Sequence, residues 1–219
     1  SSSSRGLGDV YKRQPMKSNG EIDFPALKEL VEWHIESGTH GLVSVGTTGE
    51  SATLNFNDHV KVLEKTISYI DNKIVAIAGT GANSTDEAIE LNKAASSIGY
   101  EFALSVTPYY NKPNQLGLEA HYKKIADSSV IKNILYNVPS RTACDLEPET
   151  VNKLIHHENI VGIKEAVDDP KRYKTLIKMA KNSSEPFYVL SGDDPTYFEF
   201  MKSGGDGVCL LYTSDAADD

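Results

Sequence analysis

The sequence predicts an α/β fold, a (β/α)8 TIM barrel that is incomplete because its first strand and its C-terminal helices are missing. Two observations lead to this prediction. From about residue 24 onward, short apolar runs rich in β-branched residues alternate with amphipathic segments of helical period. Each unit of strand and helix takes about 30 residues, which is typical of parallel βαβ structure.

Seven of the apolar runs are predicted strands, at 41–45, 73–78, 101–106, 133–137, 160–164, 187–190 and 206–211. The helices are predicted at 24–37, 56–70, 85–98, 116–127, 148–157, 171–182 and 195–203. Two helix starts carry an N-cap followed by an acid three residues later, Asn55 with Asp58 and Ser84 with Glu87. Pro25 falls in a predicted first turn, where its missing N–H costs nothing.

An open doubly wound sheet is the competing architecture. A dinucleotide-binding sheet of that kind carries a GxGxxG turn after its first strand. The nearest candidate, at 79–84, lacks the third glycine, so the barrel is favoured. Residues 1–22 contain no strand-like run, and both ends look foreign to the fold. We therefore predict a non-native-looking leader at 1–14, a partial catalytic barrel at 15–210 and a non-native-looking tail at 211–219.

Composition narrows the function. The 219 residues contain 22 Lys and Arg against 31 Asp and Glu, for a net charge of −9 and no basic stretch. This argues against nucleic acid or a membrane as partner, and no run of eighteen apolar residues could span a bilayer. Cys144 and Cys209 form no disulfide framework, which indicates a cytoplasmic setting. The histidines are scattered, so we predict no metal site.

Polar residues follow the predicted strands at the end where barrel enzymes work. The first run is followed by GTTGES at 46–51, whose hydroxyls and N–H groups could hold a carboxylate or phosphate. A plain turn with Ser/Thr caps is the alternative. The fourth run carries Tyr136, with Arg141 just beyond it, suited to grip a carboxylate. The alternative here is that Tyr136 fills the barrel and Arg141 is a solvated loop residue.

Lys164 is the most informative residue, because it places an amine inside the apolar strand 160–164, with Gly162 nearby to leave room. Burial lowers the pKa of a lysine and frees its amine to attack a carbonyl as a Schiff-base nucleophile. A tyrosine hydroxyl linked to a threonine hydroxyl can relay the protons that imine formation needs. A lysine that snorkels out of a strand end is the alternative. Tyr109 and Tyr110 are predicted to be packing or interface residues.

Four motifs together carry a family resemblance: SVGTTGESATL from Ser44, VTPYYNKP from Val106, LYNVPSRT from Leu135 and VGIKEA from Val161. With them the chain resembles the 4-hydroxy-tetrahydrodipicolinate (dihydrodipicolinate) synthases, members of the pyruvate-dependent class I aldolase family. The resemblance runs from about residue 15 to residue 208. It implies a lyase that condenses pyruvate with L-aspartate 4-semialdehyde in lysine and diaminopimelate biosynthesis. It further implies a homotetramer, a dimer of dimers, with no cofactor besides the pyruvate imine.

The resemblance also implies residue roles. Lys164 would form the imine, Tyr136 would shuttle protons, and Thr47 and Tyr110 would complete the relay, Tyr110 reaching into a neighbouring subunit. The implied substrate-binding residues are Thr48, Arg141, Gly192 and Cys209. An inhibitory lysine would bind at Ser51, Ala52, His59, Asn83, Glu87 and Tyr109, although Phe56 stands where a histidine is common.

Three departures from the family pattern bear on activity. In the family the first strand ends in a Thr-Pro dipeptide, and here only Pro15-Met16 remains of that signature. The eighth strand also departs from the family pattern, and Cys209 lies within it. The missing strand and helices would expose barrel edges, so we expect this chain to be poorly active. Two other functions stay open: a different pyruvate lyase, of the N-acetylneuraminate or keto-deoxy-sugar type, and a catalytically dead barrel fragment that binds anions.

Overall fold

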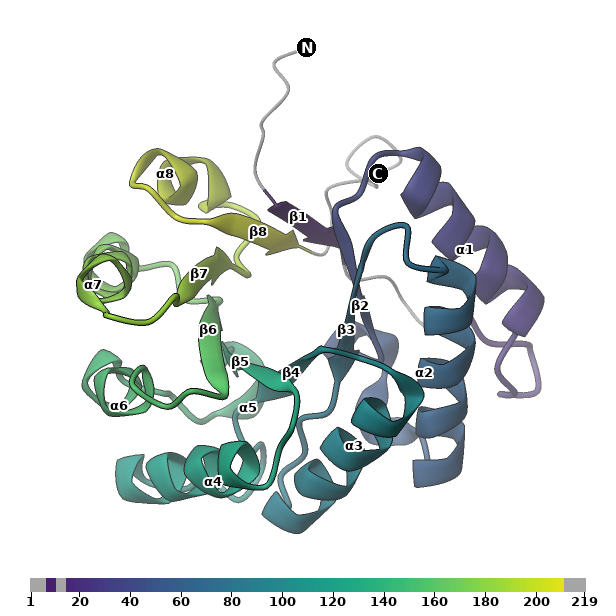
Figure 1. Cartoon of the computed structure of the whole chain (residues 1–219), viewed down its shortest axis with the longest axis horizontal. Helices are drawn as coiled ribbons and strands as arrows, with labels where there is room; N and C mark the ends of the chain where they lie inside the picture. Colours follow the sequence, from purple (N-terminus) through teal and green to yellow (C-terminus); the bar gives the residue numbers. More distant parts are fainter. Residues whose placement is uncertain (1–6, 11–14, 211–219) are drawn as a thin grey trace.

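The structure is a computed structural model that describes residues 7–10 and 15–210. Within these residues, parallel strands pair in chain order around a closed barrel (Figure 1). The strands are β1 (Leu7–Val10), β2 (Gly41–Ser44), β3 (Val75–Gly79), β4 (Phe102–Val106), β5 (Lys132–Asn137), β6 (Ile160–Glu165), β7 (Tyr188–Ser191) and β8 (Gly207–Leu210). The predicted TIM-barrel fold is confirmed.

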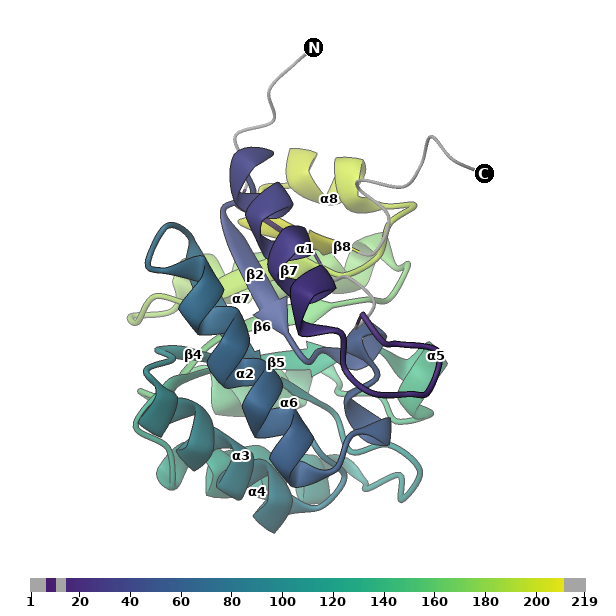
Figure 2. The same cartoon turned by 90° about the vertical axis from the view of Figure 1, so that its right-hand side faces the viewer.

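Helices form the outer layer around the strands (Figures 1 and 2). They are α1 (Phe24–Glu36), α2 (Phe56–Ile70), α3 (Thr85–Ile98), α4 (Gln115–Asp127), α5 (Pro139–Thr142), α6 (Pro148–Leu154), α7 (Pro170–Asn182) and α8 (Tyr197–Lys202). Two single turns of 3₁₀-helix, Thr47–Gly49 and Ser51–Thr53, follow β2. In the described part of the chain, none of the helices has the length and apolar character needed to cross a bilayer.

Strand β1 corrects the expectation that the first strand is missing. It lies inside the segment 1–14 and pairs in parallel with β2 on one side and with β8 on the other. Its sequence, Leu-Gly-Asp-Val, contains glycine and aspartate, which are depleted in strands, so local propensity could not reveal it. Pairing with two neighbours defines this strand. The predicted tail at 211–219 and the expected absence of C-terminal helices lie outside the described residues.

The predicted helix starts are confirmed at atomic detail. The Asn55 side chain accepts a hydrogen bond from the Asp58 N–H at 3.0 Å, and Ser84 accepts one from the Glu87 N–H at 3.4 Å. Pro25 lies in the first turn of α1, as expected. Helix α5 was not predicted, because its four residues are too few to show a helical period.

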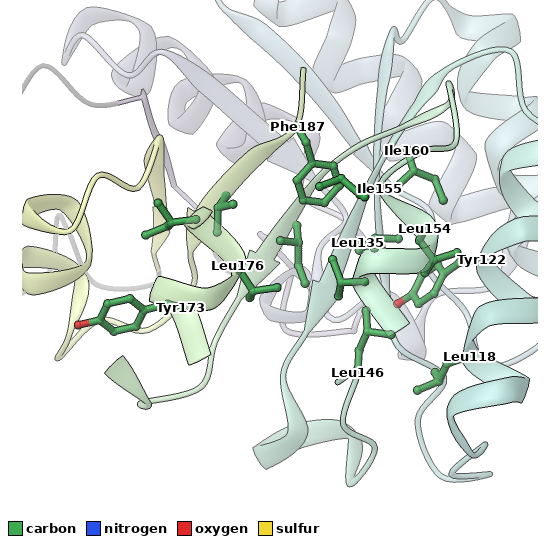
Figure 3. Close-up of a cluster of buried hydrophobic side chains, with 14 of the residues drawn as sticks. Leu118, Tyr122, Leu135, Leu146, Leu154, Ile155, Ile160, Tyr173, Leu176 and Phe187 are labelled. Atoms are coloured by element: carbon green, nitrogen blue, oxygen red, sulfur yellow. The ribbon is translucent and has the colours of Figure 1, made fainter. Parts of the chain in front are cut away.

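Alternation along the strands separates two layers of buried side chains. Ile134 and Tyr136 of β5 belong to a cluster inside the barrel, together with Val43, Ile77, Leu104 and Cys209. Leu135 and Ile163 point the other way and pack against α4, α6 and α7. Figure 3 shows this outer cluster, in which Leu135 lies near Leu154 and Tyr122. Lys164 follows Ile163 and therefore points into the barrel.

Candidate active site

Lys164 and Tyr136 form the centre of the candidate site. The two residues are register partners on the neighbouring strands β6 and β5, so both side chains enter the barrel at the same level. The Lys164 Nζ lies 4.4 Å from the centroid of the Tyr136 ring. Lys164 is only 2% exposed and Tyr136 6%, so the snorkelling alternative for the lysine is wrong. Water is largely excluded from this amine.

Gly192, at the end of β7, provides the space that the lysine occupies. A Cβ atom at Gly192 would lie 2.5 Å from Lys164 Cε and 3.1 Å from Lys164 Cγ. The sequence suggested Gly162 for this purpose, and the structure corrects that interpretation. A Cβ atom at Gly162 would instead meet the backbone oxygen of Tyr188 at 2.6 Å, so this glycine permits the close approach of β6 and β7.

The electrostatic surroundings keep the Tyr136 hydroxyl protonated. Burial raises the pKa of Tyr136 well above its usual value, and the nearby Cys209 and Asp194 act in the same direction. The guanidinium of Arg141 opposes this shift of the pKa and so lies close enough to act on the ring. At neutral pH the phenol therefore stays a proton donor.

Helix α5 carries Arg141 at the edge of this site. The residue is exposed, so its guanidinium is available to a ligand. Hydrogen bonds at Thr142 fix the helix: its hydroxyl accepts from the Thr107 hydroxyl at 3.2 Å and from the Cys144 N–H at 3.2 Å. An anchored turn next to Tyr136 is a suitable place to bind a carboxylate group.

Thr47 and Thr48 lie in the 3₁₀ turn that follows β2, and both are half-buried. The helix ends around them have no side-chain cap, which argues against the alternative of a merely structural Ser/Thr-capped turn. The chain reaches this turn through Val45, whose φ of 55° is unusual for a β-branched residue. Gly79 of β3 makes this possible, because a Cβ atom there would lie 2.2 Å from the Val45 oxygen.

The remaining predicted site residues are less enclosed, Cys209 excepted. Cys209 is 1% exposed and belongs to the interior cluster that contains Tyr136. Tyr110 is 90% exposed and has a φ of 73°, so the structure does not enclose it with the lysine. Tyr109 is half-buried and packs against the interior cluster, and burial raises its pKa. Of the two predicted alternatives, packing describes Tyr109, whereas the exposed Tyr110 fits the interface alternative.

The structure brings three of the proposed lysine-binding residues together. The Asn83 side chain donates to the backbone carbonyl oxygen of Tyr109 at 3.3 Å, and the charge of Glu87 contributes to the raised pKa of the Tyr109 phenol. The His59 ring, by contrast, is buried, and its Nε2 lies 2.7 Å from the Gly79 oxygen. Of the two others, Ser51 is half-buried and Ala52 is exposed.

Directly behind Lys164 lies a polar cluster that was not predicted from the sequence. Asn137 and Glu165 are its buried members, and Asp145 and Arg172 are half-buried. Alternation was the available signal, because a strand residue next to an inward lysine must point to the outer layer. In the described ranges, no group of three or more His, Cys, Asp or Glu side chains could hold a metal ion.

Comparison with known proteins identifies the family to which this chain is related. The model of the dihydrodipicolinate synthetase family matches residues 10–214. The 4-hydroxy-tetrahydrodipicolinate synthase of Shewanella sp. (strain MR-4) is 52% identical over 194 residues, which cover 89% of this chain and 65% of that protein. This chain therefore spans about two thirds of the length of that relative.

Solved structures agree with this result. The chloride-inhibited dihydrodipicolinate synthase from Acinetobacter baumannii, complexed with pyruvate, superposes with a TM-score of 0.89 at 48% identity, covering 93% of this chain and 69% of that one. The synthase from Cyanidioschyzon merolae with lysine bound gives a TM-score of 0.87 at 35% identity, covering 93% and 69%. By sequence and by structure, the chain belongs to the dihydrodipicolinate synthetase family.

Proposed function

We propose that this chain carries the catalytic centre of a lyase that condenses pyruvate with L-aspartate 4-semialdehyde to give 4-hydroxy-tetrahydrodipicolinate. The reaction would serve lysine and diaminopimelate biosynthesis and would use a lysine Schiff base and no cofactor. One observation carries the proposal: a buried amine, Lys164, that faces the phenol of Tyr136 inside the barrel. The pyruvate-bound structure of the Acinetobacter baumannii relative supports the substrate.

The chemistry begins at the Lys164 amine. Its lone pair attacks the ketone carbon of pyruvate, and loss of water from the adduct leaves an imine. The neutral amine is the form that attacks, and the 2% exposure of Lys164 keeps bulk water away from the reacting atoms. The imine withdraws electrons from the methyl group of pyruvate, which can then lose a proton. The resulting enamine carbon forms the new bond to the aldehyde carbon, whose oxygen takes up a proton. The amino group of the aldehyde substrate then attacks the imine carbon, and the Lys164 amine leaves as the ring closes.

Proton transfers accompany each of these steps. Tyr136 is the proposed shuttle, since its hydroxyl stays protonated at neutral pH and its ring lies against the amine. Thr47 and Tyr110 complete the proposed relay. The 90% exposure of Tyr110 fits a residue that enters the site of a second subunit, as in the proposed homotetramer.

Two groups of residues are proposed to hold the substrates. Thr48, Gly192 and Cys209 are assigned to pyruvate; the absence of a side chain at Gly192 leaves room beside the imine. Arg141 is assigned to the carboxylate of the aldehyde substrate, which its exposed guanidinium can bind through two hydrogen bonds. This arginine favours a small carboxylate-bearing aldehyde over the sugar substrates of other pyruvate lyases.

Regulation by lysine is also part of the proposal. Asn83, Glu87 and Tyr109 lie together and supply a carboxylate and hydrogen-bonding groups suited to an amino acid. The lysine-bound structure of the Cyanidioschyzon merolae relative supports this ligand.

Reductive trapping tests the function. Borohydride added with pyruvate should attach a three-carbon acid to Lys164, detected by peptide mass spectrometry, because an imine is reduced irreversibly to an amine. Lys164→Met should abolish the mass gain, and Lys153→Met, at an exposed ion pair with Glu119, should leave it unchanged. A folded chain that gains no mass would instead support the anion-binding fragment.

A further inference from the structure

The two reactive side chains are each followed by a buried polar residue. Asn137 comes directly after Tyr136, and Glu165 comes directly after Lys164. Asn137 and Glu165 are themselves register partners on β5 and β6, and they are 0% and 3% exposed. Alternation turns both side chains to the outer face of the barrel, directly behind the site.

These outward side chains are tied to each other. The Asn137 Nδ2 donates to the Glu165 carboxylate at 3.0 Å and to the Asp145 carboxylate at 2.9 Å. The Arg172 Nε donates to Glu165 at 2.8 Å, and the same guanidinium contacts Asp145 at 2.9 Å and donates to the Leu146 oxygen. The Leu146 N–H in turn donates to Asn137 Oδ1 at 2.9 Å.

Backbone hydrogen bonds connect this side-chain network to the strand ends that form the site. The Ala166 N–H donates to the backbone carbonyl oxygen of Asn137 at 3.0 Å, which joins the end of β6 to β5 just past the reactive pair. The Gly192 N–H donates to the backbone carbonyl oxygen of Glu165 at 2.7 Å, which holds Gly192 next to the lysine. The ends of β5, β6 and β7 are thus fixed to one another through residues next to Tyr136 and Lys164.

Such a network is stiff because its inner members, Asn137 and Glu165, are buried. A buried carboxylate needs hydrogen bonds and a paired charge, and Glu165 has both, from Asn137 and Arg172. Loss of any partner would leave another polar group unsatisfied, so the members have few alternative positions. An exposed ion pair, such as Lys153 with Glu119, lacks this constraint.

We propose that Asn137, Asp145, Glu165 and Arg172 form a positioning network, which sets the geometry between the Lys164 amine and the Tyr136 hydroxyl from behind the site. None of the four touches substrate; they act through the strands that carry the reactive pair. The inference rests on the proposed function, since the geometry matters only if the amine and the phenol react together.

A double-mutant cycle tests this role. Glu165→Gln keeps the size of the side chain and removes the charge that faces Arg172. We expect the single-turnover rate of imine formation with pyruvate to fall about tenfold or more, since small misplacements of reacting groups are costly. In the Tyr136→Phe background the same substitution should change the rate less than about twofold, because no hydroxyl remains to be positioned.

The readout separates positioning from simple loss of stability. Rates are normalised to the folded fraction, measured by circular dichroism, and Lys153→Met serves as the matched ion-pair control, expected to keep the wild-type rate. If Glu165→Gln does not fold, Asp145→Asn replaces it, because the Asp145 side chain is 44% exposed and its loss disturbs the core less. Equal rate losses in both backgrounds would overturn the positioning role. A wild-type chain that is not trapped at Lys164 would overturn the proposed function itself.

Discussion

The contact between Gly192 and Lys164 gives the most direct prediction, through the substitution Gly192→Ala. The added Cβ would lie 2.5 Å from Lys164 Cε, 3.1 Å from Lys164 Cγ and 3.1 Å from the Cβ of Ala166. Carbon atoms pack at about 3.5–4.0 Å, so the lysine side chain must move by about 1 Å. Because Lys164 is only 2% exposed and has little free space around it, we expect the movement to displace the amine from its position over the Tyr136 ring.

The size of the effect follows from two general costs. Adding a methyl group to a packed interior destabilises a protein by about 1–3 kcal/mol. A misplacement of a reacting group by about 1 Å lowers a rate by about 100-fold. We therefore expect Gly192→Ala to remain folded with reduced stability and to form the pyruvate imine about 100-fold more slowly.

Two measurements check this expectation. The rate of borohydride trapping at Lys164 reports on imine formation, and urea unfolding reports on stability. Gly117→Ala on α4 is the control, because the atoms within 4 Å of its added Cβ belong only to Pro113 and Asn114, and neither residue is assigned to the proposed site. Wild-type trapping per folded molecule in Gly192→Ala would refute the reasoning that this glycine makes room for the lysine.

Three further predictions concern single side chains. Tyr136→Phe should slow imine formation by about 100- to 10,000-fold, measured by trapping, since it removes the proposed general acid. Arg141→Met should leave trapping by pyruvate unchanged but weaken use of the aldehyde about 10- to 100-fold, measured by aldehyde consumption, because a charged hydrogen bond is lost; equal losses in both assays would contradict its assignment. Burial lowers the pKa of His121 to about 4. The folded chain should therefore lose up to about 3 kcal/mol of stability as the pH falls from 6.5 to 4. His121→Gln should reduce that loss in acid unfolding experiments, and the exposed His156→Gln should not.

Much of the fold was predictable because its signals are local. Apolar runs and helical periods gave the positions of β2 to β8 and of the longer helices, and Asn55 and Ser84 cap helices as expected. The predictions failed where local signals are weak. Strand β1 has a sequence that disfavours strands, and its pairing with β2 and β8 defines it.

The candidate site was predictable in its chemistry and less so in its geometry. Lys164 stood out as an amine inside an apolar strand, and burial at 2% confirms that environment. Its neighbours depend on contacts between segments far apart in sequence. Gly192 rather than Gly162 makes room for it, and Glu165 pairs with Arg172 on the following helix.

The sequence by itself determined the residue types, the alternation of strands and helices, and hence the end of the barrel at which the chemistry lies. Only the tertiary structure decided that Tyr136 and Lys164 are register partners and that their neighbours meet behind them. The physical reason is that periodicity is a property of one segment, whereas register and packing depend on how two segments align. A shift by one residue would turn Lys164 outward and bring Glu165 into the barrel.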